Sequence, residues 1–170
     1  TPENALNALP KIASSNKKLS KICSIPEAES EIEKVEKFGA RILTYVESDY
    51  PQILKNLSDP PPVLTIFGDV TILKKDMIAI VGGRNASLNG INFANKLAHE
   101  ITDAGFITVS GLAKGIDTAV HNVSFHSKPT VSVMGSGIDV VYPQENSKLY
   151  NSIIDNGGLI VTELPYSVSP

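Results

Sequence analysis

The chain has 170 residues, of which 42% are hydrophobic and 19% are charged, and its formal net charge at pH 7 is −3. This length suits one ordinary domain with a small appendage, and the slight excess of acidic residues argues against a strongly basic surface for non-specific DNA binding. The single cysteine excludes an internal disulfide, which fits a reducing compartment. The sequence has neither a signal-peptide pattern nor an apolar run long enough to span a membrane. We therefore expect a cytoplasmic protein without membrane contact.

The first part of the chain predicts a helical leader followed by two strands. Residues 1–26 are polar and contain lysines, with a short helix expected at residues 5–9. Residues 27–38 predict a longer helix, because acidic residues occupy its first turn, where the helix dipole favours them. The elements expected next are a strand, a short helix, a proline-rich connector and a second strand, at residues 41–46, 51–57, 59–62 and 63–67.

The second half of the chain alternates between strands and helices. We predict strands at residues 77–81, 106–109, 130–134 and 159–162, with helices between them at residues 89–103, 116–125 and 146–155. The first of these strands is a continuous apolar run, which is typical of a strand buried on both faces. Strands separated by helices of about ten to fifteen residues indicate parallel βαβ units with right-handed crossovers. The pattern predicts an α/β fold, a Rossmann-like three-layer α/β/α sandwich with a mostly parallel sheet, extended by the N-terminal strands and the helical leader.

Glycine-containing loops follow three of the predicted strands, at residues 82–84, 110–115 and 135–137. The carboxyl ends of parallel strands lie at one edge of a sheet, so these loops line one crevice if their strands are neighbours. Glycines leave backbone amides uncovered, and the cations Arg84 and Lys114 accompany them, so the loops suit the binding of phosphate. For any one loop, the alternative is a turn that carries glycine for steric reasons alone.

Two familiar phosphate-binding patterns are missing from these loops. Residues 82–85 lack the spacing of the GxGxxG dinucleotide fingerprint, and no acidic residue stands at the end of the second strand, so we do not expect NAD. The Walker pattern with its lysine and serine is also absent, which argues against an NTPase. We therefore expect no cofactor.

Four residues near the loops leave more than one role open. Asp117 and His121 are four residues apart on one predicted helix, so they form an acid–base pair or metal half-site, or else a local hydrogen bond that fixes the loop, which we favour. Glu163, just past the last strand, either takes part in catalysis, caps a helix or orients a loop. Tyr142 either stacks on a nucleobase beside the third loop or packs on the last helix.

Taken together, these motifs resemble the DNA-processing protein A family (DprA, also called Smf). The resemblance spans residues 27–166. The motifs that carry it are Tyr50-Pro51, Asp59-Pro60-Pro61, Val81-Gly82-Gly83-Arg84, Ser110-Gly111-Leu112-Ala113-x-Gly115-Ile116-Asp117-x-Ala119-x-His121, Gly135-x-Gly137-Ile138-Asp139-x-x-Tyr142-Pro143-x-x-Asn146 and Thr162-Glu163-x-Pro165. The motif from Ser110 to His121 is the most specific of them.

The resemblance implies a protein that is not an enzyme, binds single-stranded DNA and loads the recombinase RecA onto it during natural transformation and recombination. It also implies a fold through which members of the family form homodimers. Residues 1–37 would be the tail of a small helical domain, and residues 38–170 would be the extended Rossmann-like domain. The residues expected to hold the DNA are Gly82, Gly83, Arg84, Ser110, Gly111, Lys114, Gly135, Gly137, Tyr142 and Asn146.

The chain departs from the family pattern at two places. Gly83 stands where the family usually has serine or threonine, so one hydroxyl donor is missing and we expect backbone amides to hold the phosphate more weakly. The sequence stops at Pro170, before the family's basic segment Phe-Pro-x-Arg-Asn-Arg, so we expect a domain that is truncated at its C-terminal end.

Two other functions are kept as alternatives. One is an enzyme related to the LOG-type phosphoribohydrolases, which share this kind of fold. Their Pro-Gly-Gly-x-Gly-Thr-x-x-Glu motif is not matched, because residues 135–139 occupy the comparable loop with a different sequence. The other alternative is a protein-binding remnant whose DNA site has decayed.

Overall fold

The computed structural model describes residues 23–126 and 128–170. The chain divides into two compact units, one up to Glu33 and one from Lys34 onward. This division falls inside helix α2 (Ile25–Phe38). The unit from Lys34 onward contains the whole sheet and all three glycine loops.

The predictions for the helical leader are tested only in part. The helix predicted at residues 27–38 is confirmed by α2, whereas the short helix predicted at residues 5–9 lies outside the described residues. The assignment of residues 1–37 to the tail of a separate helical domain stays a prediction. Among the helices of the described residues, none is both long enough and apolar enough to cross a membrane.

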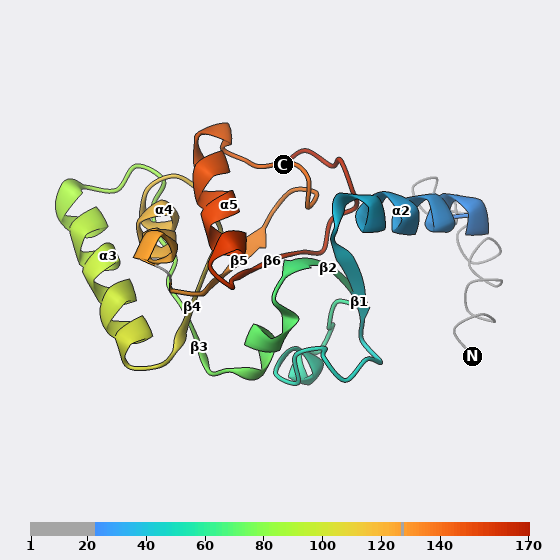
Figure 1. The fold of residues 1–170 in the computed structure, drawn as a ribbon, viewed down its shortest axis with the longest axis horizontal. Helices are drawn as coiled ribbons and strands as arrows, with labels where there is room; N and C mark the ends of the chain where they lie inside the picture. Colours follow the sequence, from blue (N-terminus) through green and yellow to red (C-terminus); the bar gives the residue numbers. More distant parts are fainter. Residues whose placement is uncertain (1–22, 127) are drawn as a thin grey trace. The chain divides into compact units, whose positions relative to one another are not determined.

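Strands and helices alternate through the larger unit (Figure 1). The strands are β1 (Arg41–Thr44), β2 (Val63–Gly68), β3 (Met77–Ala79), β4 (Ile107–Ser110), β5 (Thr130–Met134) and β6 (Leu159–Thr162). The α-helices are α3 (Leu88–Asp103), α4 (Ile116–His121) and α5 (Ser147–Asp155). The short 3-10 helices are η3 (Leu54–Asn56), η4 (Val70–Lys74), η5 (Asn122–His126) and η6 (Gln144–Asn146). Every predicted strand is present, with small differences at the ends, and the helix predicted at residues 116–125 is α4 continued by η5.

The six strands form one sheet in the order β1-β2-β6-β5-β4-β3. Strands β3, β4, β5 and β6 are parallel to one another. Strand β2 pairs antiparallel with both β1 and β6, so β1 runs in the same direction as the parallel strands. The carboxyl ends of β1 and of all four parallel strands therefore lie at one edge. The predicted α/β fold with a mostly parallel, Rossmann-like sheet is confirmed.

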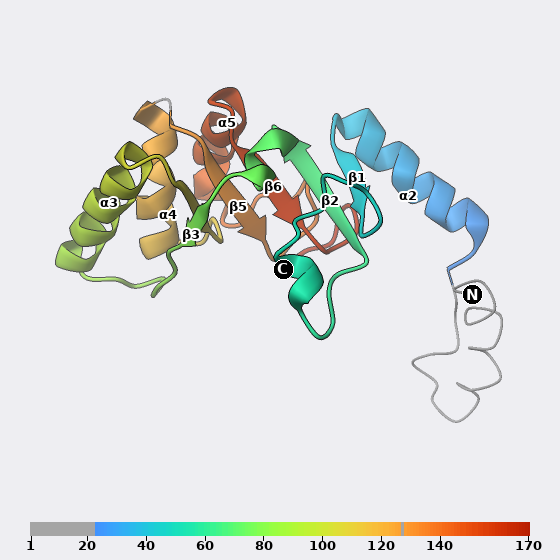
Figure 2. The ribbon, with the colours of Figure 1, turned by 90° about the horizontal axis from the view of Figure 1, so that it is seen from below.

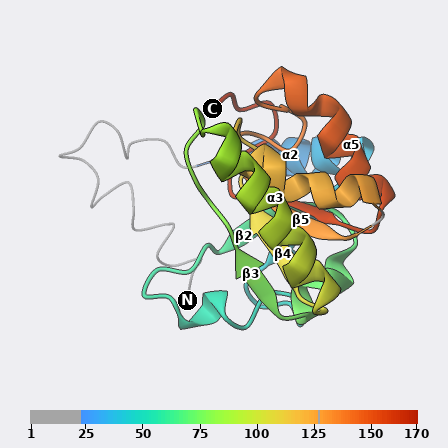
Figure 3. The same cartoon turned by 90° about the vertical axis from the view of Figure 1, so that its left-hand side faces the viewer.

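Helices α3, α4 and α5 lie on one face of the sheet (Figure 2). They connect strands that follow one another along the sheet in a single direction, so right-handed crossovers place all three on the same side. Figure 3, viewed from the α3 side, shows α3 lying across α4, with β3 as the nearest strand. The opposite face carries the connectors of residues 45–62 and 69–76, which contain η3 and η4. In the described structure, the third layer of the predicted sandwich consists of these connectors.

Apolar side chains are buried on both faces of the sheet. On the helix side, Ile153 of α5 packs with Ile160 of β6, and both are fully buried. On the connector side, Ile72 of η4 packs with Leu43 and Leu159. Strand β6 is buried along its whole length, because the two apolar clusters pack on its opposite faces. This packing fixes the middle of the sheet and thereby supports the edge that carries the loops.

Strand β3 differs from its prediction. The strand predicted at residues 77–81 ends at Ala79, followed by one more hydrogen bond from the Ile80 amide to Val109 at 2.9 Å. It lies at the edge of the sheet instead of being buried on both faces. Ile78 is 37% exposed and Val81 is 76% exposed. An apolar run reveals that a segment favours burial, but the rest of the sheet decides whether neighbours cover it.

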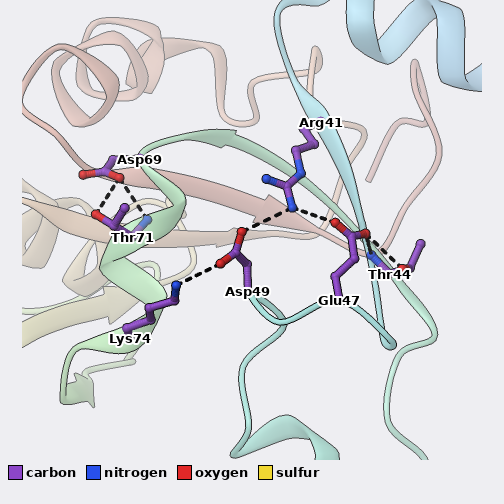
Figure 4. A network of polar contacts seen from close by, with 7 residues as sticks. All are labelled: Arg41, Thr44, Glu47, Asp49, Asp69, Thr71 and Lys74. Atoms are coloured by element: carbon purple, nitrogen blue, oxygen red, sulfur yellow. Dashed lines mark hydrogen bonds and ion pairs between the residues drawn. The ribbon is translucent and has the colours of Figure 1, made fainter.

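A chain of ion pairs fastens the connector after β1 to the sheet (Figure 4). Arg41 of β1 contacts Glu47 at 2.7 Å and Asp49 at 3.5 Å, and Asp49 contacts Lys74 of η4 at 2.9 Å. The amide of Thr44 donates to Glu47 at 2.7 Å, and this hydrogen bond lowers the pKa of the Glu47 carboxyl. The two cations of this network are thus engaged by carboxylates of the connector.

Candidate functional site

The glycine loops follow β3, β4 and β5, which are consecutive in the sheet, so the loops are adjacent at its carboxyl edge. Gly115, at φ +79°, lies directly against the first loop, because an added Cβ would overlap the carbonyl oxygens of Gly83 and Arg84. The amide of Ile116 donates to the same Gly83 oxygen at 3.4 Å. The first and second loops are therefore packed together, which only glycine at residue 115 permits.

The second loop is held from two sides. The Asp117 carboxylate accepts hydrogen bonds from the amides of Gly111 at 3.2 Å and Ala113 at 3.4 Å. On the other side, Nδ2 of Asn146 donates to the Leu112 carbonyl oxygen at 2.8 Å. Leu112 is fully buried and has φ +57°, a conformation that is costly for a residue with a side chain. These contacts hold the loop in one strained conformation.

The titratable residues of the second motif lie in the interior beneath this loop. His121 is fully buried with Nδ1 3.1 Å from Thr130 Oγ1, and burial lowers its pKa to about 4, so the ring is neutral at pH 7. Asp117 is 7% exposed. Within the described residues, three buried polar atoms have no hydrogen-bond partner: Asp117 Oδ1, His121 Nε2 and Ser132 Oγ. The same residues contain no group of three or more His, Cys, Asp or Glu side chains that could hold a metal ion. Of the open roles, the geometry favours the local hydrogen bonds that fix the loop.

The segment after the third loop, residues 139–145 with Ser147, lines an open hollow of about 690 Å³. Tyr142 precedes Pro143 through a cis peptide bond, and its side chain lines the hollow while remaining 52% exposed. Lys114 reaches the hollow from the second loop and pairs with Glu145 of η6 at 2.8 Å. The hydrogen bond and charge of Glu145 raise the pKa of the Lys114 ammonium. The hollow thus places a cation beside an accessible aromatic ring.

Apart from Gly82, five of the ten predicted residues are exposed at this edge. Arg84, Lys114 and Tyr142 are exposed, and no hydrogen bond or ion pair within residues 23–126 and 128–170 engages the Arg84 guanidinium. Gly83 and Gly135 are open, because an added Cβ at either position would meet nothing within 4 Å. These residues can contact a ligand without movement of the backbone.

The other five predicted residues make contacts within the protein. Ser110 is 3% exposed, and its hydroxyl donates to the Ile80 carbonyl oxygen at 2.7 Å. The amide of Gly137 donates to the Val168 carbonyl oxygen at 2.7 Å. Gly82 is exposed but packs against Ile116 of α4, and Gly111 and Asn146 bond to α4 and the second loop. Direct contact of these five with DNA stays a prediction, and the structure gives them a supporting role.

Two acidic residues of the site are not singled out by sequence reasoning. Glu145 occupies one of the two positions between Pro143 and Asn146 at which the motif specifies no residue. Only the presence of an acidic residue inside a motif expected to bind phosphate could have drawn attention to it. Asp139 accepts hydrogen bonds from the Ser167 amide at 2.7 Å and hydroxyl at 2.8 Å, which fastens the segment after β6 beside the third loop. Glu163 is exposed at the same edge, and its charge adds to burial in raising the pKa of Tyr50.

A model of the family described as DNA recombination-mediator protein A matches residues 41–170. The chain belongs to this family. Protein Smf of Synechocystis sp. is 32% identical over 144 residues, and DNA processing protein DprA of Bacillus subtilis is 37% identical over 134 residues. These matches cover 82% and 78% of the chain. The resemblance to the DNA-processing protein A family is confirmed.

Solved structures of family members have the same fold. DNA processing protein A (DprA) from Streptococcus pneumoniae superimposes with a TM-score of 0.75 at 30% identity over 86% of this chain. DNA processing protein A from Helicobacter pylori, whose structure is described in terms of its single-stranded DNA binding mode, gives 0.66 at 29% identity over 77% of the chain. The chain spans 50% and 58% of these two proteins, and 36% and 45% of the Synechocystis and Bacillus relatives.

Proposed function

We propose that this chain binds single-stranded DNA at the carboxyl edge of its sheet, as a non-catalytic part of DNA processing in recombination and natural transformation. The observation that carries the proposal is that Lys114 and Tyr142 line one hollow at this edge, while Arg84 is exposed on the adjacent first loop. Arg84 and Lys114 supply charge for phosphates, and Tyr142 offers a ring on which a base can stack. The Helicobacter pylori relative, which is described as binding single-stranded DNA, has the same fold.

The ten predicted residues divide into two roles in this proposal. Arg84, Lys114 and Tyr142 contact the strand, with the open backbone of Gly83 and Gly135 letting phosphates approach closely. The other five shape the loops from within, and the ones that do so are Gly82, Ser110, Gly111, Gly137 and Asn146.

A non-catalytic role is supported by the position of the titratable residues in the most specific motif. Asp117 and His121 are buried and do not line the hollow: Asp117 bonds to the second loop, and His121 contacts Thr130 of β5. The rival function is the phosphoribohydrolase reaction, which releases a free base from a nucleotide. Incubation of the chain with AMP should leave AMP intact, and release of adenine would contradict the non-catalytic proposal.

Loading of RecA and formation of a homodimer are further parts of the proposal, supported by membership of the family. Sedimentation of the chain alone measures its oligomeric state. Assembly of RecA on an oligonucleotide, followed with and without the chain, measures loading. Faster RecA assembly in the presence of the chain is the expected result, and no change would remove RecA loading from the proposal without touching DNA binding.

Titration of a fluorescein-labelled oligothymidylate with the chain tests the central proposal. We expect saturable binding that weakens as salt rises, because phosphates bound by cations release counterions. The same sequence in a duplex should bind less well, because paired bases cannot stack on Tyr142. Equal binding of single and double strands would contradict the assignment of the hollow to an unpaired base.

A further inference from the structure

An ion pair lies in the wall of the hollow that the proposed function assigns to DNA. Lys114 Nζ lies 2.8 Å from Glu145 Oε1, and the two side chains come from different segments, the second glycine loop and η6. Both line the hollow together with Tyr142. The cation that would meet a phosphate is therefore already neutralised by a carboxylate of the same chain.

The backbone around Glu145 is fixed by its neighbour. Asn146 is 8% exposed, and its Nδ2 donates to the Leu112 carbonyl oxygen at 2.8 Å and to Thr118 Oγ1 at 2.9 Å. These bonds fasten η6 to the second loop and hold residue 145 close to Lys114. The Glu145 side chain keeps 68% of its surface exposed, so its carboxylate can leave Lys114 without disturbing the core.

We infer that Glu145 competes with the DNA backbone for Lys114 and so sets the affinity of the site, an inference that rests on the proposed function. A carboxylate and a phosphodiester accept the same charge-assisted hydrogen bonds from an ammonium group. A phosphate that binds Lys114 therefore displaces Glu145, whose negative charge then stays in the hollow and opposes the phosphate. Because the pair is exposed, this competition is mild and readily reversed.

The two cations of the site differ in this respect. Within the described residues, Arg84 has no ion-pair partner, whereas Lys114 has Glu145. A strand can therefore gain the contact with Arg84 at once, but it gains the contact with Lys114 only against Glu145. Removal of the carboxylate should strengthen the second contact and leave the first unchanged.

The substitution Glu145→Gln tests this inference. It removes the charge and keeps the size, and we expect the variant to bind oligothymidylate about two- to fivefold more tightly than the unsubstituted chain at the same salt concentration. Glu100→Gln is the matched control, because Glu100 is similarly exposed at 61% and pairs with Lys96 on α3, away from the loops. The control should bind as the unsubstituted chain does.

A double-substitution cycle separates competition from general repulsion. With Lys114→Ala in the background, Glu145→Gln should gain clearly less affinity, because no lysine is left to release. An equal gain in both backgrounds, or an equal gain from Glu100→Gln, would overturn the inference. If Lys114→Ala weakens binding but Glu145→Gln has no effect in a variant with unchanged thermal unfolding, this inference fails while DNA binding stands. If the unsubstituted chain does not bind the oligonucleotide at all, the proposed function fails, and this inference with it.

Discussion

At the scale of single residues, the proposed DNA site depends most on Arg84. Its guanidinium is exposed, and within the described residues no carboxylate holds it. We expect Arg84→Ala to weaken the binding of oligothymidylate by about 1–3 kcal/mol, the range for losing a charge-assisted hydrogen bond. Fluorescence titration at low and moderate salt measures the loss.

Lys96→Ala provides the control for Arg84→Ala. Lys96 lies on α3 with 76% of its side chain exposed, so its removal costs the chain one positive charge outside the loops. We expect its affinity to match that of the unsubstituted chain. If both variants lose affinity equally, net charge and not the loop edge determines binding.

His121 makes the stability of the fold depend on pH. Burial lowers the pKa of its imidazole from 6.5 to about 4. Between these two pH values the unfolded chain binds a proton at His121 that the folded chain does not bind. The free energy of unfolding should therefore be fully retained above pH 6.5 and should fall by roughly 3 kcal/mol from this residue as the pH drops to 4. Urea unfolding at about pH 7, 5.5 and 4, which spans this window, measures the decrease.

His121→Gln isolates this contribution, because glutamine does not titrate. The variant is expected to be less stable at pH 7 but to lose less stability on acidification than the unsubstituted chain. His99 titrates in both proteins, and its pKa is also lowered by burial, so it cancels in the comparison. Identical pH dependence in the two proteins would mean that His121 already binds its proton in the folded state.

Ser110 and Asn146 mark the limit of prediction at this scale. Both stand in loops that suit phosphate, and both have polar groups that could donate to it. In the fold, the Ser110 hydroxyl turns to Ile80 and the Asn146 amide turns to Leu112. A motif reveals that a polar residue is placed at the site, but the direction of its side chain depends on carbonyl groups that only the folded backbone brings near.

At the scale of elements, the contact between the first and second loops should be as important as the strands themselves. Gly115 has φ +79° and lies against the backbone of Gly83 and Arg84. Gly115→Ala should therefore destabilise the fold by about 2 kcal/mol or more and displace the first loop. Gly135→Ala is the matched control, with open space around the added methyl group. It should change stability by less than about 0.5 kcal/mol in thermal unfolding. Equal destabilisation would show that the two loops do not depend on this contact.

The alternation of apolar runs and amphipathic segments is enough to predict the elements and the parallel sheet. Local patterns decide where a strand begins, and the right-handed crossover rule decides on which side each helix lies. The place of a strand within the sheet is a different matter. Strand β3 has the sequence of a buried strand but is an edge strand with Ile78 partly exposed. Whether a strand has one neighbour or two depends on where distant segments of the chain pair in the sheet. The apolar run of β3 contains no information about that pairing.

At the scale of the whole molecule, the charge balance limits how DNA can be bound. The chain carries 18 acidic and 15 basic side chains, and cations such as Arg41 and Lys74 are paired with carboxylates of the connector after β1. The net charge of −3 therefore gives the chain no excess of positive charge for a broad electrostatic surface. Affinity must come from the few cations at the loop edge, from backbone amides and from stacking on Tyr142.

This balance predicts a shallow dependence of DNA affinity on salt. Each phosphate neutralised on a single strand contributes about −0.7 to the slope of log K against log salt concentration, so Arg84 and Lys114 together give about −1.4. Arg84→Ala should reduce the slope by about 0.7, whereas Tyr142→Ala should lower affinity at every salt concentration and leave the slope unchanged. Titrations across a tenfold range of salt measure both effects. A slope of about −4 or steeper would require more cations than this edge presents, and it would place the DNA on another surface.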